Sequence, residues 1–300
     1  MAQDLTLLLA FEDEAPLARE LAEALGLRLD FIRRHRFPDG ELRLVLPKPL
    51  PAGVILLRGL QQPNEKMVEL LIAAPAAREL GARQLVLVTP YLAYMRQDIE
   101  FTPGEAVSQR HVARWLAQLF DRVITLDPHL HRIASLDEVM PPGVGIALSV
   151  APVLGAWIAR HVPGALLIGP DEESGQWVKE AAQAGGLDHA VGRKLREGDH
   201  QVRLALPEVE VKGRAVVLLD DMASTGRTLI GAAEQLLARG AASVDVAVTH
   251  ALFNGDALPL LKAAGVRHVW SSNAVPHESN AVSVVPLLAK VLTPRPDSRR

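Results

Sequence analysis

Residues 215–237 constrain the fold of this chain more than any other part of its sequence. The run 215–219 (AVVLL) is short, apolar and rich in branched side chains, which predicts a strand buried on both faces. Leu229, Leu236 and the apolar residues near them then recur at helical spacing. A buried strand followed directly by a helix is the repeating unit of parallel α/β sheets, so this segment predicts that class of fold.

The strand ends in two carboxylates, and the turn between it and the helix carries several hydroxyl-bearing residues. Backbone N–H groups and the positive end of the helix dipole point at such a turn, which suits a phosphate dianion. Thr225 and Thr228 add hydroxyl donors, while Asp220 and Asp221 can accept hydrogen bonds from a sugar diol or hold a divalent metal. Acid pairs followed by Ser, Thr and Gly also form ordinary helix N-caps, so the turn alone leaves both interpretations open.

Strand-like and helix-like segments alternate along the rest of the chain. Predicted strands cover residues 5–11, 27–31, 54–57, 84–89, 122–126, 165–168, 243–248, 265–270 and 282–285. Predicted helices lie at 17–25, 67–80, 112–119, 153–158, 229–237 and 286–292. A length of 300 residues suits two α/β domains, and the Pro- and Gly-rich residues 140–143 place the boundary near Leu148. We therefore expect domains at 1–148 and 149–300, with the last helix able to pack back on the first domain.

Composition and charge exclude several classes of protein. A formal net charge of −3 and a pI near 6.4 argue against nucleic-acid binding. The chain has no cysteine, which excludes disulfides and thiolate chemistry and fits a reducing cytoplasm. Acids rather than basic residues flank the first apolar segment, so it does not read as a signal peptide, and no apolar stretch reaches membrane-spanning length. We expect a cytoplasmic protein that binds neither nucleic acid nor membrane.

Further polar residues follow the predicted strands of the first half. Asp39-Gly40 lies between apolar runs, which predicts a hairpin turn. Strand 84–89 leads into Arg96, Gln97 and Asp98, at the end of the strand where open α/β sheets bind ligands. Arg96 can stack on a base or pair with a phosphate, and the alternative is a surface ion pair with Asp98.

Candidate metal and anion ligands also follow strands. His129 and His131 stand two residues apart after strand 122–126, but no third ligand lies at zinc-site spacing, and a His here is also a common structural hydrogen-bonder. Asp171, after strand 165–168, is a candidate metal or water ligand or another helix N-cap. Lys194 and Arg196 lie on one side of an extended segment and could together bind a polyphosphate, although such charged runs are usually solvated hairpins.

The motif at 220–228 resembles the phosphoribosyl pyrophosphate motif of type I phosphoribosyltransferases and of ribose-phosphate pyrophosphokinases. Two acids, three residues and then Thr-Gly-x-Thr carry this resemblance. Further motifs, in the same order along residues 7–292, are similar to the second family. They are Phe37-Pro38-Asp39-Gly40-Glu41, Pro90-Tyr91 to Arg96-Gln97-Asp98, Pro103-Gly104-Glu105-Ala106, Asp127-Pro128-His129, Asp171, Lys194-Leu195-Arg196, Thr249-His250 and Asn273. A transferase normally needs only one such domain, so the chain is identified as a member of the pyrophosphokinase family.

This resemblance implies an α/β fold of two tandem type I phosphoribosyltransferase-like domains. It implies transfer of the β,γ-diphosphoryl group of ATP to the 1-hydroxyl of ribose 5-phosphate, with Mg²⁺ as cofactor. The implied residues are catalytic Lys194 and Arg196; ATP-binding Phe37, Asp39, Glu41, Arg96, Gln97 and Asp98; metal-binding His129 and Asp171; and ribose 5-phosphate-binding Asp220, Asp221, Ser224, Thr225, Gly226, Arg227 and Thr228. It also implies a homo-oligomer in which a neighbouring subunit supplies residues 37–41 to a shared ATP site.

Some positions depart from the family pattern. Ser224 replaces a common Asp, Arg227 stands where many members have Gly, Pro128 replaces Leu, and residues 172–175 replace a more apolar, Gly-rich stretch. Two alternatives are a phosphoribosyltransferase and a non-catalytic regulatory paralogue. The retained Lys194, Arg196, His129 and Asp220 argue against the paralogue.

Overall fold

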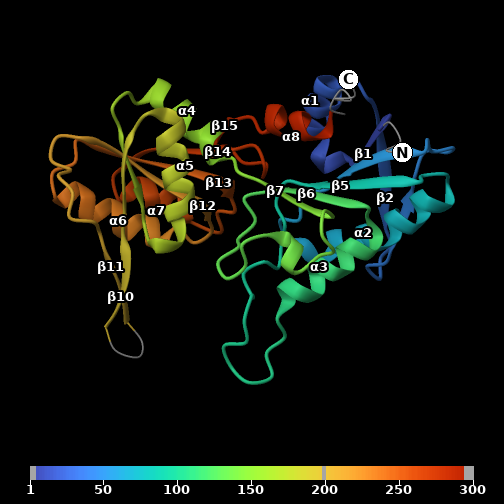
Figure 1. Cartoon of the computed structure of the whole chain (residues 1–300), viewed down its shortest axis with the longest axis horizontal. Coiled ribbons are helices and arrows are strands. Elements are labelled where there is room, and N and C mark those ends of the chain that lie inside the picture. Colours follow the sequence, from blue (N-terminus) through green and yellow to red (C-terminus); the bar gives the residue numbers. More distant parts are fainter. Residues whose placement is uncertain (1–4, 198–200, 294–300) are drawn as a thin grey trace, which may run out of the picture. The chain divides into compact units, whose positions relative to one another are not determined.

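The protein is described by a computed structural model that covers residues 5–197 and 201–293, with the backbone alone for 194–197 and 201–204. The chain folds into two compact units. Unit 1 comprises residues 1–148 and 284–300, and unit 2 comprises residues 149–283. Each unit is built on its own mostly parallel sheet flanked by helices, which confirms the predicted α/β class (Figure 1).

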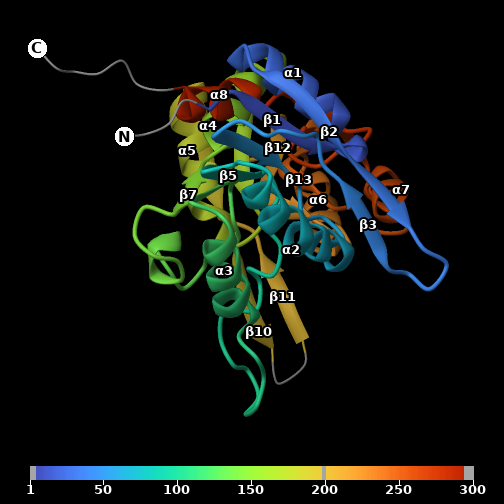
Figure 2. The ribbon, with the colours of Figure 1, turned by 90° about the vertical axis from the view of Figure 1, so that its right-hand side faces the viewer.

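Unit 1 contains a seven-stranded sheet with the order β3-β2-β1-β4-β5-β6-β7. Its strands are β1 (Leu7–Phe11), β2 (Arg28–Arg36), β3 (Leu42–Val45), β4 (Gly53–Leu57), β5 (Gln84–Thr89), β6 (Arg122–Leu126) and β7 (Gly145–Leu148). All neighbouring strands are parallel except β2 and β3, which form an antiparallel hairpin. Every residue of β1 and β4 is buried, as expected for central parallel strands covered on both faces. The β2–β3 hairpin extends beyond the rest of this sheet (Figure 2).

The helices of unit 1 cover both faces of its sheet. They are the short 3₁₀ helices η1 (Glu12–Glu14) and η2 (Leu136–Glu138), and the α-helices α1 (Ala15–Leu25), α2 (Pro63–Glu79), α3 (Ser108–Leu119) and α8 (Val285–Leu292). Helices α1 and α8 pack together on one face, and α2 and α3 lie on the other (Figures 1 and 2). Helix α1 ends at Gly26, whose left-handed φ of 63° confirms the predicted stop. Helix α2 begins earlier than predicted because Pro63 suits the first helical position.

Unit 2 contains a six-stranded parallel sheet with the order β15-β14-β13-β12-β8-β9. Its strands are β8 (Leu166–Gly169), β9 (Asp188–Val191), β12 (Ala215–Ala223), β13 (Ser243–Ala251), β14 (Val266–Ser272) and β15 (Asn280–Val282). Strands β10 (Arg193–Glu197) and β11 (Gln201–Ala205) form a separate antiparallel ribbon that leads away from this sheet (Figure 1). The charged run around Lys194 is therefore a hairpin, as the usual interpretation of such runs predicts.

The helices of unit 2 pack in pairs. They are the 3₁₀ helix η3 (Glu172–Ser174) and the α-helices α4 (Ala151–His161), α5 (Gly175–Gly185), α6 (Arg227–Ala238) and α7 (Ala257–Ala263). Helices α4 and α5 contact each other, as do α6 and α7. The first pair packs closely because Gly155 has no side chain: a Cβ built on it would lie 2.0 Å from the carbonyl oxygen of Ala181. In the described part of the chain, no helix is long and apolar enough to cross a membrane.

Several predicted boundaries in unit 2 are wrong. Strand β12 continues past Leu219 to Ala223 because β13 pairs with it through Met222 and Ala223, so Asp220 and Asp221 lie inside the strand. Strand β13 likewise continues to Ala251. Of the predicted strand 282–285, only Val282 belongs to a strand, the short β15, and Val285 already begins α8. The edge strands β7 and β9 were not predicted, since both are short and only partly buried.

Candidate active site

The turn after β12 joins the strand to helix α6 through a glycine in the left-handed region. Gly226 is the N-cap of α6, with φ 70° and ψ −1°, a conformation that favours glycine. A glycine has no side chain with which to cap the helix. The N–H groups of the first turn of α6 therefore receive no side-chain hydrogen bond from the N-cap residue. The N-cap is thus neither an acid nor a hydroxyl residue, which counts against an ordinary capping role for the motif. The turn keeps the features that suit a bound anion.

Three carboxylates gather where β8 and β12 lie side by side. Asp220 and Asp221 belong to β12, and Asp171 follows β8, its neighbour in the sheet. Asp221 and Asp171 are buried, and Asp220 is partly accessible. Burial raises the pKa of Asp220 well above its ordinary value, and the negative charges of Asp221 and Asp171 raise it further. This repulsion marks a position where a cation or the hydroxyl donors of a sugar would be stabilising.

Asp171 also caps a helix. Its carboxylate accepts hydrogen bonds from the backbone N–H groups of Glu173 at 3.1 Å and Ser174 at 3.3 Å, at the start of η3. The alternative prediction that Asp171 is a helix N-cap is therefore confirmed. This cap holds the carboxylate beside β12, so the same residue is fixed in place for a second, ligand-binding role.

The turn of the motif is fastened to the loop that follows β13. The side-chain amide of Asn254 donates to the hydroxyl of Ser224 at 3.1 Å, and the backbone N–H of Asn254 donates to the carbonyl of Ser224 at the same distance. Thr225, Arg227 and Thr228 are exposed around the first turn of α6. Sequence reasoning missed Asn254, because nothing in the sequence pairs it with a residue thirty positions away. Unit 2 thus brings all seven predicted ribose 5-phosphate residues and Asp171 to the carboxyl ends of its neighbouring strands β8 and β12.

The predicted ATP-binding residues Phe37, Asp39 and Glu41 lie at the tip of the β2–β3 hairpin. The N–H of Phe37 donates to the carbonyl of Glu41 at 2.8 Å, which closes the turn, and Gly40 has a left-handed φ of 95°. The carboxylate of Asp39 accepts from the N–H of Glu41 at 3.1 Å. The Phe37 ring is 36% exposed, and the rings of His35 and Phe37 meet edge to face at 4.8 Å. The hairpin turn is confirmed, and it presents an aromatic ring and two acids to the surroundings.

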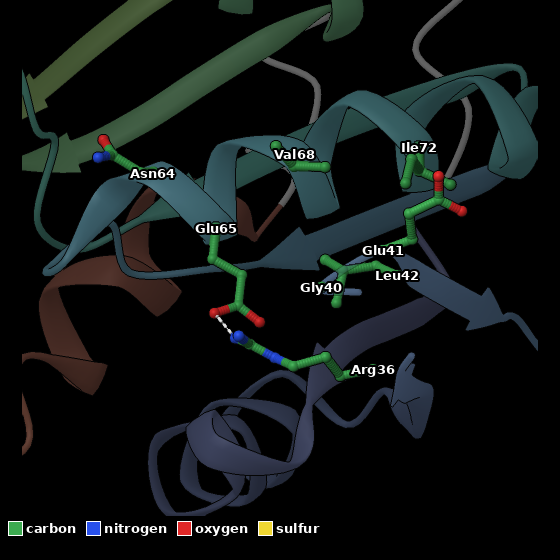
Figure 3. Close-up of a pocket in the computed structure, with 8 residues that line it drawn as sticks. All are labelled: Arg36, Gly40, Glu41, Leu42, Asn64, Glu65, Val68 and Ile72. Carbon is green, nitrogen blue, oxygen red and sulfur yellow. Dashed lines mark hydrogen bonds and ion pairs between the residues drawn. The ribbon is translucent and has the colours of Figure 1, made fainter. Parts of the chain in front are cut away.

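A pocket of about 560 Å³ lies between this hairpin and helix α2. Figure 3 shows Glu41 and Leu42 of the hairpin on one side and Val68 and Ile72 of α2 on the other. At one end of the pocket Arg36 forms an ion pair with Glu65. Unit 1 therefore has a partly apolar recess beside the predicted ATP-binding loop.

The other predicted ATP-binding residues follow β5. Arg96 is exposed, Gln97 is partly buried and donates to the carboxylate of Glu105 at 3.0 Å, and Asp98 is buried. Asp98 accepts a hydrogen bond from the guanidinium of Arg132 at 2.7 Å. Tyr94, just before them, has a left-handed φ of 64°, a costly conformation for a residue with a side chain and one found most often at functional sites. Arg96 is the most accessible of the three for a ligand.

The two histidines after β6 contact each other. The rings of His129 and His131 lie 3.7 Å apart between centroids and their Nε2 atoms form a hydrogen bond. Among the residues that the structure describes, no group of three or more His, Asp or Glu side chains is arranged to hold a metal ion by itself. A metal bound here would need ligands from elsewhere, such as substrate phosphates and water.

Lys194 and Arg196, the predicted catalytic residues, occupy alternate positions of β10 opposite Leu204 and Val202 of β11. Their side chains lie outside the part of the chain that the structure describes. Residues 198–200, which belong to the same charged run of the sequence, lie outside it entirely.

These features define a class of protein: an α/β protein of two mostly parallel sheets, with a phosphoribosyl-type acid and turn motif on the second. Sequence comparison is more specific. A family model described as the N-terminal domain of ribose phosphate pyrophosphokinase matches residues 6–119, and one described as a phosphoribosyl synthetase-associated domain matches residues 204–289. The chain belongs to the ribose-phosphate pyrophosphokinase family.

Individual relatives cover almost the whole chain. The ribose-phosphate pyrophosphokinase of Methanopyrus kandleri is 36% identical over 95% of this chain and 98% of its own length. That of Halobacterium salinarum is 32% identical over 95% of this chain and 100% of its own. The crystal structure of phosphoribosylpyrophosphate synthetase from Mycobacterium smegmatis superposes with a TM-score of 0.83 at 26% identity, covering 97% of this chain and 98% of that one. The predicted family and fold are confirmed.

Proposed function

We propose that this chain transfers the β,γ-diphosphoryl group of ATP to the 1-hydroxyl of ribose 5-phosphate, giving phosphoribosyl pyrophosphate and AMP. Membership of the family makes it a diphosphotransferase, and the relatives that span its length carry the name ribose-phosphate pyrophosphokinase. The single observation that carries the proposal is the arrangement at β12. Asp220 and Asp221 precede the Gly226-capped start of α6 on one continuous strand, turn and helix.

We assign the binding of ribose 5-phosphate to this strand, turn and helix. The first-turn N–H groups of α6 and the hydroxyls of Thr225 and Thr228 would hold the 5-phosphate. Asp220 and Asp221 would accept hydrogen bonds from the ribose hydroxyls. Binding both ends of the sugar orients O1, so that it can attack the β-phosphorus in line with the leaving α-phosphate oxygen. The new O1–Pβ bond forms as the Pβ–O bond to AMP breaks.

The ATP side falls to residues of unit 1. Arg96 is exposed and suited to a base or phosphate, and the exposed ring of Phe37 offers a stacking surface for adenine. Asp39 and Glu41, beside Phe37, can accept hydrogen bonds from amino or hydroxyl groups of the nucleotide.

In the proposed oligomer, residues 37–41 serve a shared ATP site of a neighbouring subunit. Sedimentation should therefore show an oligomer, and a fully active monomer would contradict this part of the proposal.

The cofactor we propose is Mg²⁺, and the residues at β12 fit it. Mg²⁺ prefers oxygen ligands and usually binds through one or two carboxylates together with substrate phosphates and water. Asp171 lies beside Asp220, whose pKa is raised first by burial and then by the charges of Asp221 and Asp171, so a cation would offset an existing repulsion. Of the two metal ligands that the family resemblance implies, Asp171 lies in unit 2 beside β12, and His129 follows β6 in unit 1. When bound, Mg²⁺ supplies positive charge that neutralises the phosphates.

Lys194 and Arg196 are the catalytic residues of the proposal. Two cations on one short strand, β10, would stabilise the negative charge that develops on the transferring group and on AMP. The ribbon of β10 and β11 is separate from the main sheet, as a segment that closes over bound substrates would be.

The location that we propose for the protein is the cytoplasm, and the lack of cysteine fits this location.

The test is to incubate purified protein with Mg²⁺ and ATP, with and without ribose 5-phosphate, and to measure AMP. AMP formation that depends on the sugar supports the proposal. A phosphoribosyltransferase would instead release diphosphate from phosphoribosyl pyrophosphate and a base, and a regulatory paralogue would do neither. Family membership favours the pyrophosphokinase over both alternatives.

A further inference from the structure

A cluster of charges with a fully buried centre lies next to the ATP-side residues of unit 1 and has no role in the proposed mechanism. We call it the Arg58 cluster; its members are Asp13, Glu14, Arg34, Arg58, Lys66 and Glu69. Arg58 follows β4, and both Arg58 and Glu69 are 0% exposed. Fully buried charges are rare unless they are paired, and here they pair with each other.

Arg58 is held on several sides. Its guanidinium donates to Asp13 at 2.7 Å and to Glu14 at 3.3 Å, forms an ion pair with Glu69, and has the ring of Phe11 4.5 Å away. Burial raises the pKa of Glu14, although the charges of Lys66 and Arg58 oppose this. The cluster joins the end of β1, the end of β4 and helix α2, three elements that converge at one edge of the sheet.

Arg34 connects this cluster to the hairpin. Arg34 lies on β2 and pairs with the other oxygen of Glu69, and the hydrogen bond from Arg34 to Glu69 is the largest cause of a raised pKa of Arg34. Two residues further along β2, Arg36 pairs with Glu65 of the same helix. Both arginines thus fasten the strand that leads to Phe37 onto the first turns of α2.

The same end of α2 also contacts the segment that carries Arg96. The hydroxyl of Tyr94 forms a hydrogen bond with the side-chain oxygen of Asn64, and the N–H of Leu60, just before the helix, donates to the carbonyl of Tyr91 at 2.9 Å. Polar side chains at the start of α2 therefore contact both predicted ATP-binding segments.

We propose that Arg34 and Glu69, anchored by buried Arg58, are positioning residues that fix the β2–β3 hairpin for ATP binding. The inference rests on the proposed function for the identity of the ligand. Glu69 divides its two oxygens between the core cation Arg58 and the hairpin cation Arg34, so the hairpin is oriented by a carboxylate that is itself fully buried and paired in the core. The exposed pair of Arg36 with Glu65 adds less, because exposed ion pairs are weak.

The test compares Arg34→Met, Arg34→Lys and Arg33→Met in the full chain. Arg34 is 34% exposed, so its replacement should not prevent folding. Arg33 is its exposed neighbour on the same strand and gives a control with the same change of charge. Hydrogen exchange of amides 33–45 should become about tenfold faster in Arg34→Met, the order expected for loss of a hydrogen bond between charged groups, and should change little in Arg33→Met.

Titration calorimetry with Mg²⁺ and ATP, and separately with ribose 5-phosphate, gives the second readout. We expect ATP affinity to fall about five- to tenfold in Arg34→Met and the sugar affinity to stay within about twofold, with Arg34→Lys recovering most of the ATP affinity. A purely structural role would weaken both ligands together. Unchanged exchange in the hairpin, or unchanged ATP affinity, would overturn the inference.

These outcomes are distinct from failure of the proposed function. If the wild type makes no AMP that depends on the sugar, the proposed reaction fails. Exchange and nucleotide titration still decide whether the Arg58 cluster positions the hairpin, because neither measurement requires turnover.

Discussion

Asn254 holds Ser224 by two hydrogen bonds, one from its side-chain amide to the Ser224 hydroxyl and one from its backbone N–H to the Ser224 carbonyl, both 3.1 Å long. In the family pattern an acid is common at the Ser224 position, whereas here a neutral hydroxyl accepts a hydrogen bond from a neutral amide. The loop after β13 thereby fixes the turn that we assign to the 5-phosphate.

This relationship predicts the effect of Asn254→Ala. Loss of one side-chain hydrogen bond, worth about 1 kcal/mol, should raise the KM for ribose 5-phosphate about fivefold and leave the KM for ATP nearly unchanged. Ser224→Ala removes the same bond from the other side. Steady-state kinetics should therefore be measured for both single variants and the double variant. The KM of the double variant for ribose 5-phosphate should not exceed that of the single variant with the higher KM. Fully additive losses would show that the two side chains act independently.

Asp220→Asn should stabilise the fold and impair the reaction. Burial and the adjacent acids raise the pKa of Asp220, so its ionised form is unfavourable in the folded state, and a neutral amide relieves this. We expect Tm at pH 8 to rise by about 2–4 °C, the shift for roughly 1 kcal/mol in a domain of this size, while the KM for ribose 5-phosphate rises at least about tenfold.

Asp245→Asn is the matched control for that variant. Asp245 is also an acid within a strand; it is fully buried, and it pairs with Arg267 at 2.6 Å. Its loss should lower Tm, because a paired arginine would be left without its carboxylate. If both variants changed Tm in the same direction, repulsion at Asp220 would not be the cause.

Lys194→Ala should lower turnover without preventing binding. Removal of a transition-state electrostatic contact typically costs about 10²-fold in kcat, while substrate affinity changes only a few-fold. Arg193→Ala, at the preceding position of β10, changes the same charge on the neighbouring residue and should retain nearly full turnover. Equal turnover of wild type and Lys194→Ala would remove β10 from the mechanism.

The stability of unit 1 should depend on pH through Glu14. Burial raises its pKa above the ordinary 4.5, so the folded state holds the proton more tightly than the unfolded chain does. An acid whose pKa is higher in the folded state contributes its full stabilisation below its pKa in the unfolded chain. That contribution is lost as the pH rises through its pKa in the folded state. The Tm of Glu14→Gln relative to wild type should therefore increase between about pH 4.5 and pH 8, as thermal melts followed by circular dichroism can measure. A constant difference over that range would contradict the raised pKa.

Much of the fold was predictable because its signals are local. The central strands β4, β5 and β6 are continuous apolar runs, and Gly26 ends α1 by its left-handed conformation. The edge strands β7 and β9 and the extensions of β12 and β13 depend on pairing with distant strands, which periodicity along one segment does not report. For the same reason Asp220 was expected at the very end of its strand, whereas β12 continues past it to Ala223.

The site divides in the same way. The acid and turn motif at 220–228 is contiguous, so its resemblance to a phosphoribosyl pyrophosphate motif is visible in the sequence. The contact of Asn254 with Ser224 and the pairing of Arg58 with Glu69 join residues from separate elements, so sequence patterns did not reveal them. A charged residue directly after a buried strand, as Arg58 is after β4, was the one available signal for the Arg58 cluster.

The proposed reaction is tested most directly by ³¹P NMR of ATP and ribose 5-phosphate incubated with the protein and Mg²⁺. Transfer of the intact β,γ-diphosphoryl group predicts AMP and phosphoribosyl pyrophosphate in equal amounts, with both diphosphate phosphorus atoms on the sugar. Formation of ADP with a singly phosphorylated C1, or no reaction of the sugar, would contradict it.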